Sequence, residues 1–336
     1  MTLILGEETL ADVLDMAEAI DLVEEAYTHE AAGRTLIAPR QTTKLEGGWM
    51  RLMFAADYAT GYAATKAFHL ARGVGVRYLV LLYRLEDGEL LAILDGRLIT
   101  DLRTGATSGV AARRLAPPVA SSVGILGSGH QARTQLEALA VVLPLVSASV
   151  FSLTREHRRA FADEMSEKLG LAVEPVDSAA AAVRGQPVVV LATNATGPEP
   201  VLRASWLADS ALICAVGSTR AEAIEVDEAT FERAKLVVVD TLNAATEAGD
   251  LQRALESGRI SPDGLLSLAQ LVGRPPEPFA GGHAVFKSVG TALQDLALAA
   301  RYYERLGPGS QGLAAPGLAS LKQPVSYATP LEETSS

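Results

Sequence analysis

The chain has 336 residues, a formal net charge of -11 and a hydrophobic fraction of 49%. Its length predicts two domains, and its apolar content is enough for a substantial core. The acidic balance excludes a nucleic-acid-binding protein, because neutralising phosphates requires a basic face. The N-terminal segment has acidic residues and no basic region, so we expect no signal peptide. No apolar run approaches the roughly 18 to 20 residues that span a bilayer, and we expect a cytoplasmic protein without membrane or nucleic-acid partners.

The first third of the chain predicts a helix followed by strands and a second helix. Apolar residues recur at helical spacing over residues 17–32, and Gly33 ends that pattern. Two apolar runs, 77–85 and 89–94, flank an Asp-Gly pair, which is a strong hairpin signal. A helix rich in small residues is predicted over 100–115.

Strands and helices alternate beyond Pro117, near which we place a domain boundary. The strand candidates are residues 122–126, 148–153, 187–192, 211–216 and 236–239. Short apolar runs of this kind fit parallel strands buried on both faces, and their alternation with helices predicts a doubly wound sheet. A last helix is predicted over 290–303. The tail 307–336 is rich in Gly, Pro, Ser and Ala, and we expect it to be flexible.

Cysteine and histidine usage indicates neither a disulfide framework nor a metal site. The one cysteine, Cys214, lies in an apolar strand candidate, so we expect a small buried hydrophobe and not a nucleophile. The five histidines are scattered without metal-ligand spacing, so we expect no metal.

A glycine-rich turn over residues 123–132 is the strongest local motif. An apolar strand there breaks into Gly-x-Gly-x-x-Ala and then into a helical pattern. Gly127 permits the bend out of the strand, Gly129 lets backbone N–H groups approach a pyrophosphate, and Ala132 keeps the helix close to the sheet. The alternative is a structural turn without a ligand. The surrounding strands and helix favour dinucleotide binding.

Arg103 lies one turn into the helix that we expect to begin at Thr100 or Asp101. A cation there opposes the helix macrodipole unless an anion joins it. One interpretation is a solvated arginine, or one paired with Asp101. The other is a carboxylate-binding site made from the guanidinium and the helix N-terminus.

Four further polar residues are candidates on local grounds alone. Lys66 and Arg40 lie in segments short of charge, although most such side chains are solvated. Arg51 lies in an apolar run that ends at Phe54, so it is either at a strand edge or facing a pocket. Asp240 closes a predicted parallel strand, where open α/β sheets bind ligands. The alternative for Asp240 is an N-cap for the next helix.

The end of the second strand of the doubly wound sheet bears on cofactor choice. An acidic residue at this position would hold the ribose diol of NAD. This chain has Ser152, Thr154 and Arg155 there, and no acid until Glu156. Hydroxyls and an arginine suit a 2′-phosphate, so the sequence favours NADP(H) over NAD(H).

Several ordered segments carry a resemblance to a known family. They are residues 99–106, 124–132, 215–218, 225–227, 238–240 and 286–290, with Asp295. Together, over about residues 10–303, the chain resembles the ornithine cyclodeaminase/μ-crystallin family of NAD(P)-binding proteins. The resemblance implies a Rossmann-type doubly wound parallel sheet inserted into a second α+β domain. Residues 117–290 would be the NAD(P)-binding domain. Residues 1–116, completed by about 291–320, would bind substrate and form the dimer.

The resemblance also implies roles for individual residues. Arg40, Lys66 and Arg103 would bind the α-carboxylate of an amino or imino acid, with Arg51 also in the substrate site. Asp240 would be the acid/base, with Lys66 as the second catalytic residue. The implied cofactor contacts are Thr104, Gly127, Ser128, Gly129, His130, Gln131, Ser152, Thr154, Arg155, Thr193, Val216, Gly217, Ser218 and Lys287.

The family is functionally mixed, so the resemblance implies more than one activity. The leading interpretation is an NAD(P)(H)-dependent oxidoreductase acting on the C–N bond of a small α-amino or α-imino acid. An ornithine cyclodeaminase-type lyase with recycled NAD is the alternative, and an NADPH- and ligand-binding protein without turnover is the third. The family's cyclodeaminases carry a glutamate about where Arg51 stands. We therefore expect a substrate with a neutral or acidic side chain, or a keto or imino acid, and not ornithine.

The N-terminal part of the chain bears on assembly. Residues 17–94 form a unit too small and too apolar to stand without another layer. By resemblance, it pairs across a two-fold axis into a homodimer.

Overall fold

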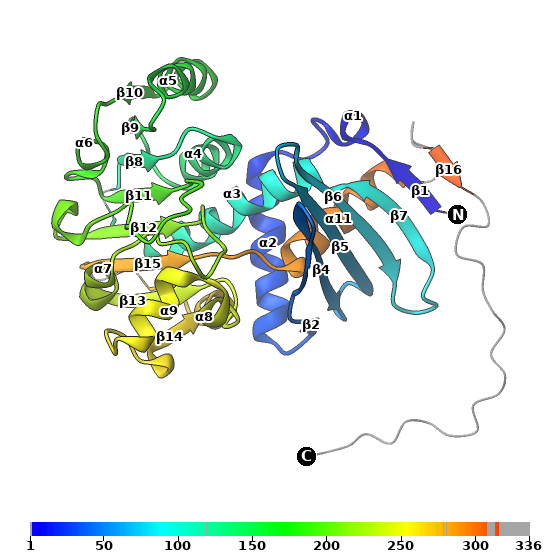
Figure 1. Ribbon diagram of the computed structural model, residues 1–336. Coiled ribbons are helices and arrows are strands. Elements are labelled where there is room, and N and C mark those ends of the chain that lie inside the picture. The colour runs from blue at the N-terminus through cyan, green and yellow to red at the C-terminus, as the bar shows by residue number, and fades with distance from the viewer. Residues whose placement is uncertain (1, 119, 278, 280, 308–312, 316–336) are drawn as a thin grey trace.

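The computed structural model describes residues 2–118, 120–277, 279, 281–307 and 313–315. Two sheets lie side by side and are linked by helices (Figure 1). We refer to them as sheet A, built mainly from the first third of the chain, and sheet B. Among the described residues, no helix combines the length and apolar character needed to cross a bilayer.

Sheet A is mixed and contains the strand order β16-β1-β7-β6-β5-β4-β2, with β3 paired to β4. Its strands are β1 (Thr2–Leu5), β2 (Thr35–Ile37), β3 (Gln41–Leu45), β4 (Gly48–Asp57), β5 (Tyr62–Ala71), β6 (Gly75–Arg84), β7 (Leu90–Asp95) and β16 (Leu313–Ala315). The predicted hairpin is confirmed as β6 and β7, with Gly88 at a φ of 71° in the turn. Side chains of β6 point alternately to the two faces of the sheet, so Val80 and Leu82 are buried whereas Leu79 is 49% exposed.

Sheet B is parallel throughout, in the order β10-β9-β8-β11-β12-β15-β13-β14. Its strands are β8 (Ser122–Leu126), β9 (Ser147–Phe151), β10 (Ala172–Pro175), β11 (Val188–Leu191), β12 (Ala211–Ala215), β13 (Ala234–Val239), β14 (Leu265–Ser267) and β15 (His283–Lys287). The predicted doubly wound sheet is therefore confirmed, and Cys214 is buried in β12 as expected. Burial raises the pKa of its thiol to about 12.

Helices cover both faces of sheet B and one face of sheet A (Figure 1). The α-helices are α1 (Glu7–Leu10), α2 (Met16–Ala31), α3 (Gly96–Leu115), α4 (His130–Val142), α5 (Arg155–Leu169), α6 (Ala179–Val183), α7 (Glu228–Arg233), α8 (Ala244–Glu247), α9 (Gly249–Glu256), α10 (Leu268–Val272) and α11 (Ala292–Leu306). Short 3-10 turns occur at η1 (Ala204–Trp206) and η2 (Pro262–Gly264).

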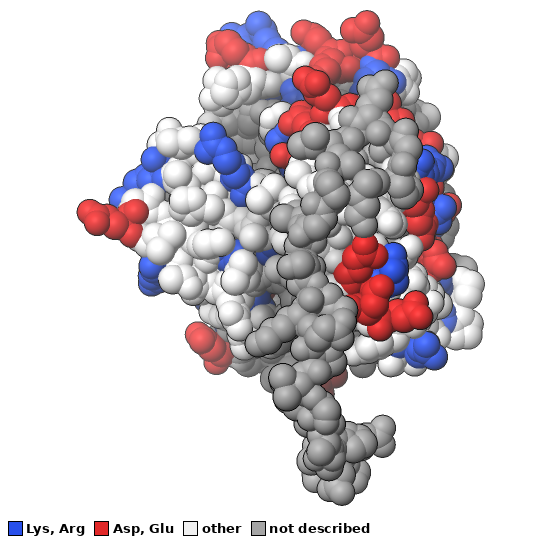
Figure 2. Space-filling model, turned by 90° about the vertical axis from the view of Figure 1, so that its right-hand side faces the viewer, with Lys and Arg blue, Asp and Glu red and all other residues white. Residues whose placement is uncertain are grey.

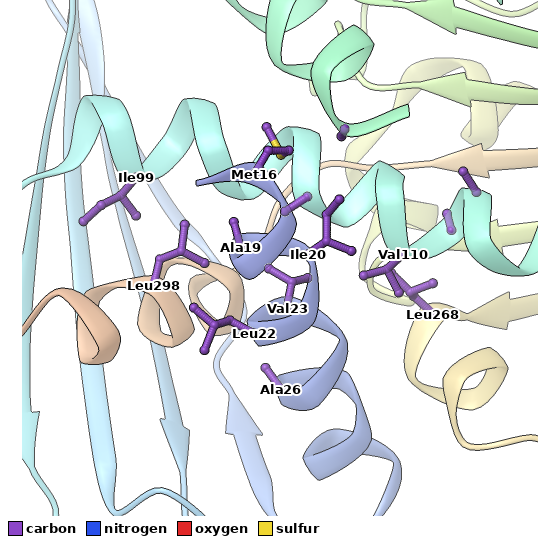
Figure 3. Packing of buried hydrophobic residues seen from close by; sticks show 14 of the residues in the cluster. Met16, Ala19, Ile20, Leu22, Val23, Ala26, Ile99, Val110, Leu268 and Leu298 are labelled. Carbon is purple, nitrogen blue, oxygen red and sulfur yellow. The ribbon is translucent and has the colours of Figure 1, made fainter. Parts of the chain in front are cut away.

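One apolar cluster of buried residues extends from sheet A to sheet B and includes the buried face of α2, and a second cluster lies within sheet B and the segments packed on it. Ile20 points from α2 toward Val110 of α3, and Leu22 points toward Leu298 of α11 (Figure 3). Gly109 allows α3 to approach, because a Cβ there would lie 2.8 Å from the Cδ1 atom of Ile20. The segments that lead into and out of sheet B are thus packed against sheet A.

Helix α3 begins earlier than predicted. Asp95 caps it by accepting a hydrogen bond from the N–H of Arg97, so the helix starts at Gly96. Arg103 therefore lies in the middle of the helix and not in its first turn. The expected site that combines the Arg103 guanidinium with the helix N-terminus is therefore wrong, because the macrodipole acts only within the terminal turns.

The expected flexible tail contains one ordered strand. Strand β16 pairs antiparallel with β1, whose other edge pairs with β7. This pairing satisfies backbone groups that β1 would otherwise present as an open edge. The rest of the tail prediction, over 308–312 and 316–336, lies outside the described residues.

Candidate functional site

The carboxyl ends of five neighbouring strands of sheet B carry most of the predicted residues. Because all strands are parallel, the segments after β8, β11, β12, β13 and β15 meet at one edge of the sheet. The segments are Gly127–Gln131, Thr193, Val216–Ser218, Asp240 and Ser288–Gly290. This edge is where doubly wound sheets bind ligands.

The turn after β8 has the geometry that a dinucleotide pyrophosphate requires. Gly127 adopts a φ of +112°, and a Cβ there would lie 2.2 Å from the carbonyl oxygen of Ala192. Gly129 is the N-cap of α4, and a Cβ there would meet no heavy atom within 4 Å. Among the residues that the structure describes, no side chain caps α4, so its first N–H groups are available to an anion. The residues of this turn therefore fit the cofactor.

The residues expected at the ribose lie between the end of β9 and the start of α5. The hydroxyls of Ser128 and Ser152 are 2.9 Å apart, and Thr154 and Arg155 are exposed. Sequence reasoning missed Arg158, whose Nη1 donates to the backbone oxygen of Ser152 at 3.0 Å and whose Nη2 donates to Asp177 at 2.6 Å. Arg158 holds the end of β9 in place. Its position one turn into α5 was the available signal.

Gln131 links the glycine-rich turn to α3, and His130, which precedes it in the chain, is exposed. Gln131 donates its Nε2–H to Asp101 at 2.9 Å, and Asp101 also lies 3.3 Å from Nη1 of Arg97, so its partners in the described residues do not include Arg103. The hydroxyl of Thr104 bonds within its own helix, to the backbone oxygen of Thr100 at 2.7 Å.

A buried ion cluster supports the loops after β11 and β12. Glu225 accepts hydrogen bonds from the Thr193 hydroxyl at 2.6 Å and from the Ser218 N–H at 2.7 Å. Its carboxylate lies 3.5 Å from the ammonium of Lys287, which also donates to Asp250 at 3.1 Å. The Lys287 side chain has no exposed surface. Two carboxylates hold this ammonium inside the protein, and the cofactor contact expected of Lys287 stays a prediction.

The three predicted carboxylate-binding cations lie together, although they come from three distant segments. Lys66, on β5, donates to the hydroxyl of Thr100 and to Asp295, both at 2.7 Å. The Nη1 of Arg103 donates to Gln294 at 2.7 Å, and its Nε lies 3.5 Å from Asp295. The Nε of Arg103 is buried without a hydrogen-bond partner among the described residues.

Arg40 joins the cluster from the other side. Its Nη2 donates to the backbone oxygens of Val289 and Gly290, both at 2.8 Å, and its Nε lies 2.9 Å from Glu247. Gly290 has a φ of +82°, and a Cβ there would lie 2.5 Å from the Nη1 of Arg103. A glycine is required there because the turn packs directly against the guanidinium.

Asp240 holds this turn and does not cap the next helix. Its carboxylate accepts hydrogen bonds from the Ser288 hydroxyl at 2.6 Å, the Val289 N–H at 3.0 Å and the Gly290 N–H at 2.6 Å. The N-cap of α8 is Asn243. The N-cap interpretation was therefore wrong, because the side chain turns toward β15.

Two titratable residues of α2 were missed in the sequence. Tyr27 accepts a hydrogen bond from Gln294 at 2.7 Å, and burial raises its pKa well above the ordinary value. Burial, and secondarily the negative charge of Asp240, raises the pKa of Glu30 to about 7. Both lie on a helix whose apolar pattern gave no sign of a polar face toward the site. Burial likewise lowers the pKa of Lys66 to about 8.

The fold and site define an α/β protein with a dinucleotide-binding turn beside a cationic cluster. The chain belongs to the ornithine cyclodeaminase/mu-crystallin family, whose model matches residues 2–310. The resemblance seen in the sequence is thereby confirmed.

Individual relatives cover most of the chain. An alanine dehydrogenase of Archaeoglobus fulgidus is 30% identical over 316 residues, which cover 90% of this chain and 94% of that protein. The solved Delta(1)-pyrroline-2-carboxylate reductase of Thermococcus litoralis, in complex with NADH and L-proline, has a TM-score of 0.84 and 31% identity, covering 90% of this chain and 97% of that one. A solved archaeal alanine dehydrogenase dimer with bound NAD has a TM-score of 0.84 and 30% identity, covering 90% and 95%.

The two glycines of the turn should respond differently to substitution. Gly129→Val places a side chain in open space where a pyrophosphate would lie, so we expect an unchanged thermal midpoint and loss of nucleotide binding. Gly127→Ala forces a Cβ onto a backbone oxygen at positive φ, so we expect loss of stability itself. Thermal unfolding and fluorescence titration of both variants with NADPH check this. Undiminished nucleotide affinity in Gly129→Val would contradict the assignment.

Proposed function

We propose that this protein is an NAD(P)(H)-dependent oxidoreductase that acts on the C–N bond of a small α-amino or α-imino acid. The observation that carries the proposal is the convergence of Arg40, Lys66 and Arg103 beside the edge of sheet B that fits a dinucleotide. The relatives named above are an alanine dehydrogenase and a pyrroline-carboxylate reductase, and both names describe redox chemistry at a carbon bonded to nitrogen.

The residues of the cluster supply binding, orientation and proton transfer. The bound dinucleotide supplies or accepts the hydride at the substrate α-carbon. Arg40, Arg103 and protonated Lys66 hold the α-carboxylate, which fixes the α-carbon relative to the cofactor. A pKa of about 8 gives Lys66 both charge states near neutral pH, as a residue that donates a proton to the substrate nitrogen requires. Asp240 is the proposed acid/base partner, and its present hydrogen bonds also fix the turn beside it.

Arg51 disfavours the alternative of cyclodeamination. A lyase acting on a diamino acid has to accept a cationic side chain. Arg51 and Arg40 both line the cleft beside the cluster, and burial, followed by the charge of Arg40, lowers the pKa of Arg51. A second amine would meet like charge there.

Activity assays on 2-oxo acids with ammonium, and on cyclic imino acids, test the function. We expect oxidation of reduced nicotinamide, seen as an absorbance decrease, with amino-acid formation. Ammonia release without a net absorbance change would indicate a lyase. Nucleotide binding without turnover of any substrate would indicate a binding protein.

Two substitutions should separate binding from chemistry. Arg103→Met deletes a charge-assisted contact with the carboxylate, so we expect KM to rise about 10- to 100-fold. Asp240→Asn can keep its three hydrogen bonds through one oxygen but cannot exchange a proton at neutral pH, so we expect kcat to fall with KM retained. Full turnover by Asp240→Asn, with an unchanged thermal midpoint, would show that Asp240 only positions the turn and is not the acid/base.

We further propose that NADP(H) is preferred over NAD(H). No carboxylate follows β9 until Glu156, and Arg155 lies exposed at the start of α5, three residues after Ser152. An exposed arginine and hydroxyls suit a 2′-phosphate. The solved relatives name NADH and NAD, so the proposal rests on these local residues alone.

Arg155→Ala should therefore weaken NADPH binding by about three- to tenfold and leave NADH binding unchanged, since only the phosphate loses a partner. Fluorescence titration with both nucleotides measures this. Tighter binding of NADH than of NADPH by the unmodified protein would contradict the preference.

We also propose a homodimer formed through the face of sheet A opposite α2 and α11. Leu52, Ala67 and Leu79 lie side by side across β4, β5 and β6, and Leu52 and Leu79 are 41% and 49% exposed. Figure 2 faces the side of the molecule that carries β7 and β1 and shows a broad area with few charged side chains. Apolar exposure of this kind marks interaction surfaces, and the solved archaeal alanine dehydrogenase is a dimer.

Leu79→Lys should disrupt this dimer, because two copies would bring like charges into an apolar contact. Light scattering should give a dimer for the unmodified protein and a monomer for the variant. Val141→Lys, at a 45% exposed position on α4, is the matched control and should stay dimeric. A monomeric unmodified protein at micromolar concentration would contradict the proposal.

A further inference from the structure

A cleft of about 650 Å³ opens beside the carboxylate-binding cluster, between β3, β4 and the loops after β12 and β13. Its lining is unusually cationic. The cations are Arg40, Lys44, Arg51, Arg72 and Arg220, whereas the acids are Glu222 and Glu247. Of these acids, Glu247 is already paired with Arg40, and Glu222 is exposed at the rim. The cleft therefore has more positive than negative charge to offer a ligand.

Arg51 occupies the wall of this cleft next to the cluster. It lies on the same face of β4 as Met53, which is paired with Lys66 of β5. A molecule held at Lys66 by its α-carboxylate would therefore extend along this face toward Arg51.

The guanidinium of Arg51 is held in position but not neutralised. Its Nε donates to the hydroxyl of Thr42 at 2.9 Å, its Nη1 lies 3.5 Å from the hydroxyl of Thr219, and its plane lies over the Trp49 ring, 4.7 Å from the centroid. Within the described part of the chain, no carboxylate forms an ion pair with Arg51 or with Arg220. Hydroxyl and ring contacts fix the direction of the guanidinium and leave its charge available.

We propose that the substrate is an α-amino or α-imino dicarboxylic acid whose side-chain carboxylate binds Arg51. The inference rests on the proposed oxidoreductase function and narrows its substrate class. In the direction of reduction, the imine carbon accepts a hydride from the reduced nicotinamide and the imine nitrogen accepts a proton. The C=N bond becomes C–N, the dinucleotide is oxidised, and both carboxylates are unchanged. Arg220, whose Nη2 donates to the backbone oxygen of Ala195 at 3.1 Å, adds positive charge to the lining of the cleft.

Matched 2-oxo acids test this assignment, with ammonium as the nitrogen source. Oxaloacetate and 2-oxobutyrate have four carbons each, and 2-oxoglutarate and 2-oxovalerate have five. Each pair differs by a terminal carboxylate in place of a methyl group. We expect kcat/KM to be higher for the dicarboxylic member of at least one pair. In Arg51→Met, the ratio of dicarboxylic to monocarboxylic kcat/KM should fall about 10- to 100-fold.

Arg259→Met is the control for loss of one positive charge. Arg259 pairs with Glu232 on the surface and does not line the cleft, so this variant should keep the wild-type ratio. Equal ratios in the Arg51→Met and unmodified proteins would overturn the proposal while leaving the oxidoreductase function intact. Preference of the unmodified protein for the monocarboxylic member of both pairs would also overturn it.

Calorimetric binding separates the substrate class from turnover. L-aspartate and L-2-aminobutyrate are titrated into the protein in the presence of NADP⁺, with unfolding midpoints measured for each variant. Tighter binding of L-aspartate that is lost in Arg51→Met supports the proposal even if no redox turnover occurs, in which case only the proposed function fails. Equal binding within this pair and within the five-carbon pair of L-glutamate and L-norvaline would overturn it.

Discussion

The turn from β15 into α11 is the constraint on which the site depends. Asp240, at the end of β13, accepts hydrogen bonds from the backbone and side chain of residues 288–290. The same turn offers two backbone oxygens to Arg40, and the helix that follows carries Gln294 and Asp295. These two side chains hold the remaining cations of the cluster. One short segment therefore connects the cofactor edge of sheet B to the cations supplied by sheet A.

This arrangement explains why so many polar groups are buried between two apolar layers. Lys66, Asp240 and Asp295 are each at most 1% exposed, and each has polar partners. Removing charges from water is costly, and a buried ion pair is poor evidence for stability in itself. A satisfied network does, however, fix one geometry, because any displaced member would leave a partner unpaired. The position of each cation relative to the sheet edge is therefore specified more tightly than apolar packing would specify it.

The sequence predicted the parts of the molecule that local rules determine. Strand-turn-helix chemistry around Gly127 and the Asp-Gly hairpin depend on backbone requirements of neighbouring residues, and both formed as expected. The start of α3 was misplaced because Asp95 belongs to the preceding strand as well as capping the helix. Strand β15 was not predicted, since a run that begins with His283 and ends with Lys287 does not resemble a buried strand until its partners are known.

The site itself could be predicted only in part, because its residues come from segments that are far apart in the sequence. Arg40, Lys66 and Arg103 were identified through resemblance, because nothing in their spacing brings a loop, a strand and a helix to one point. The sequence did not predict that Glu247 and Asp295 would pair with these cations. Paired charges are recognisable only in three dimensions, where burial makes a partner obligatory.

The ion pairs of Arg40 with Glu247 and of Lys66 with Asp295 affect how strongly the cluster can bind a substrate. Glu247 and Asp295 already neutralise part of the positive charge of the cluster. A substrate α-carboxylate therefore gains less binding free energy there than it would from unpaired cations. Arg51 differs, because hydroxyls and an aromatic ring orient its guanidinium without neutralising it. An interaction contributes to selectivity when the alternative ligand leaves a polar group without its partner. Discrimination between substrates therefore depends on the end of the molecule that reaches Arg51, while the α-carboxylate end serves mainly to position the reacting carbon.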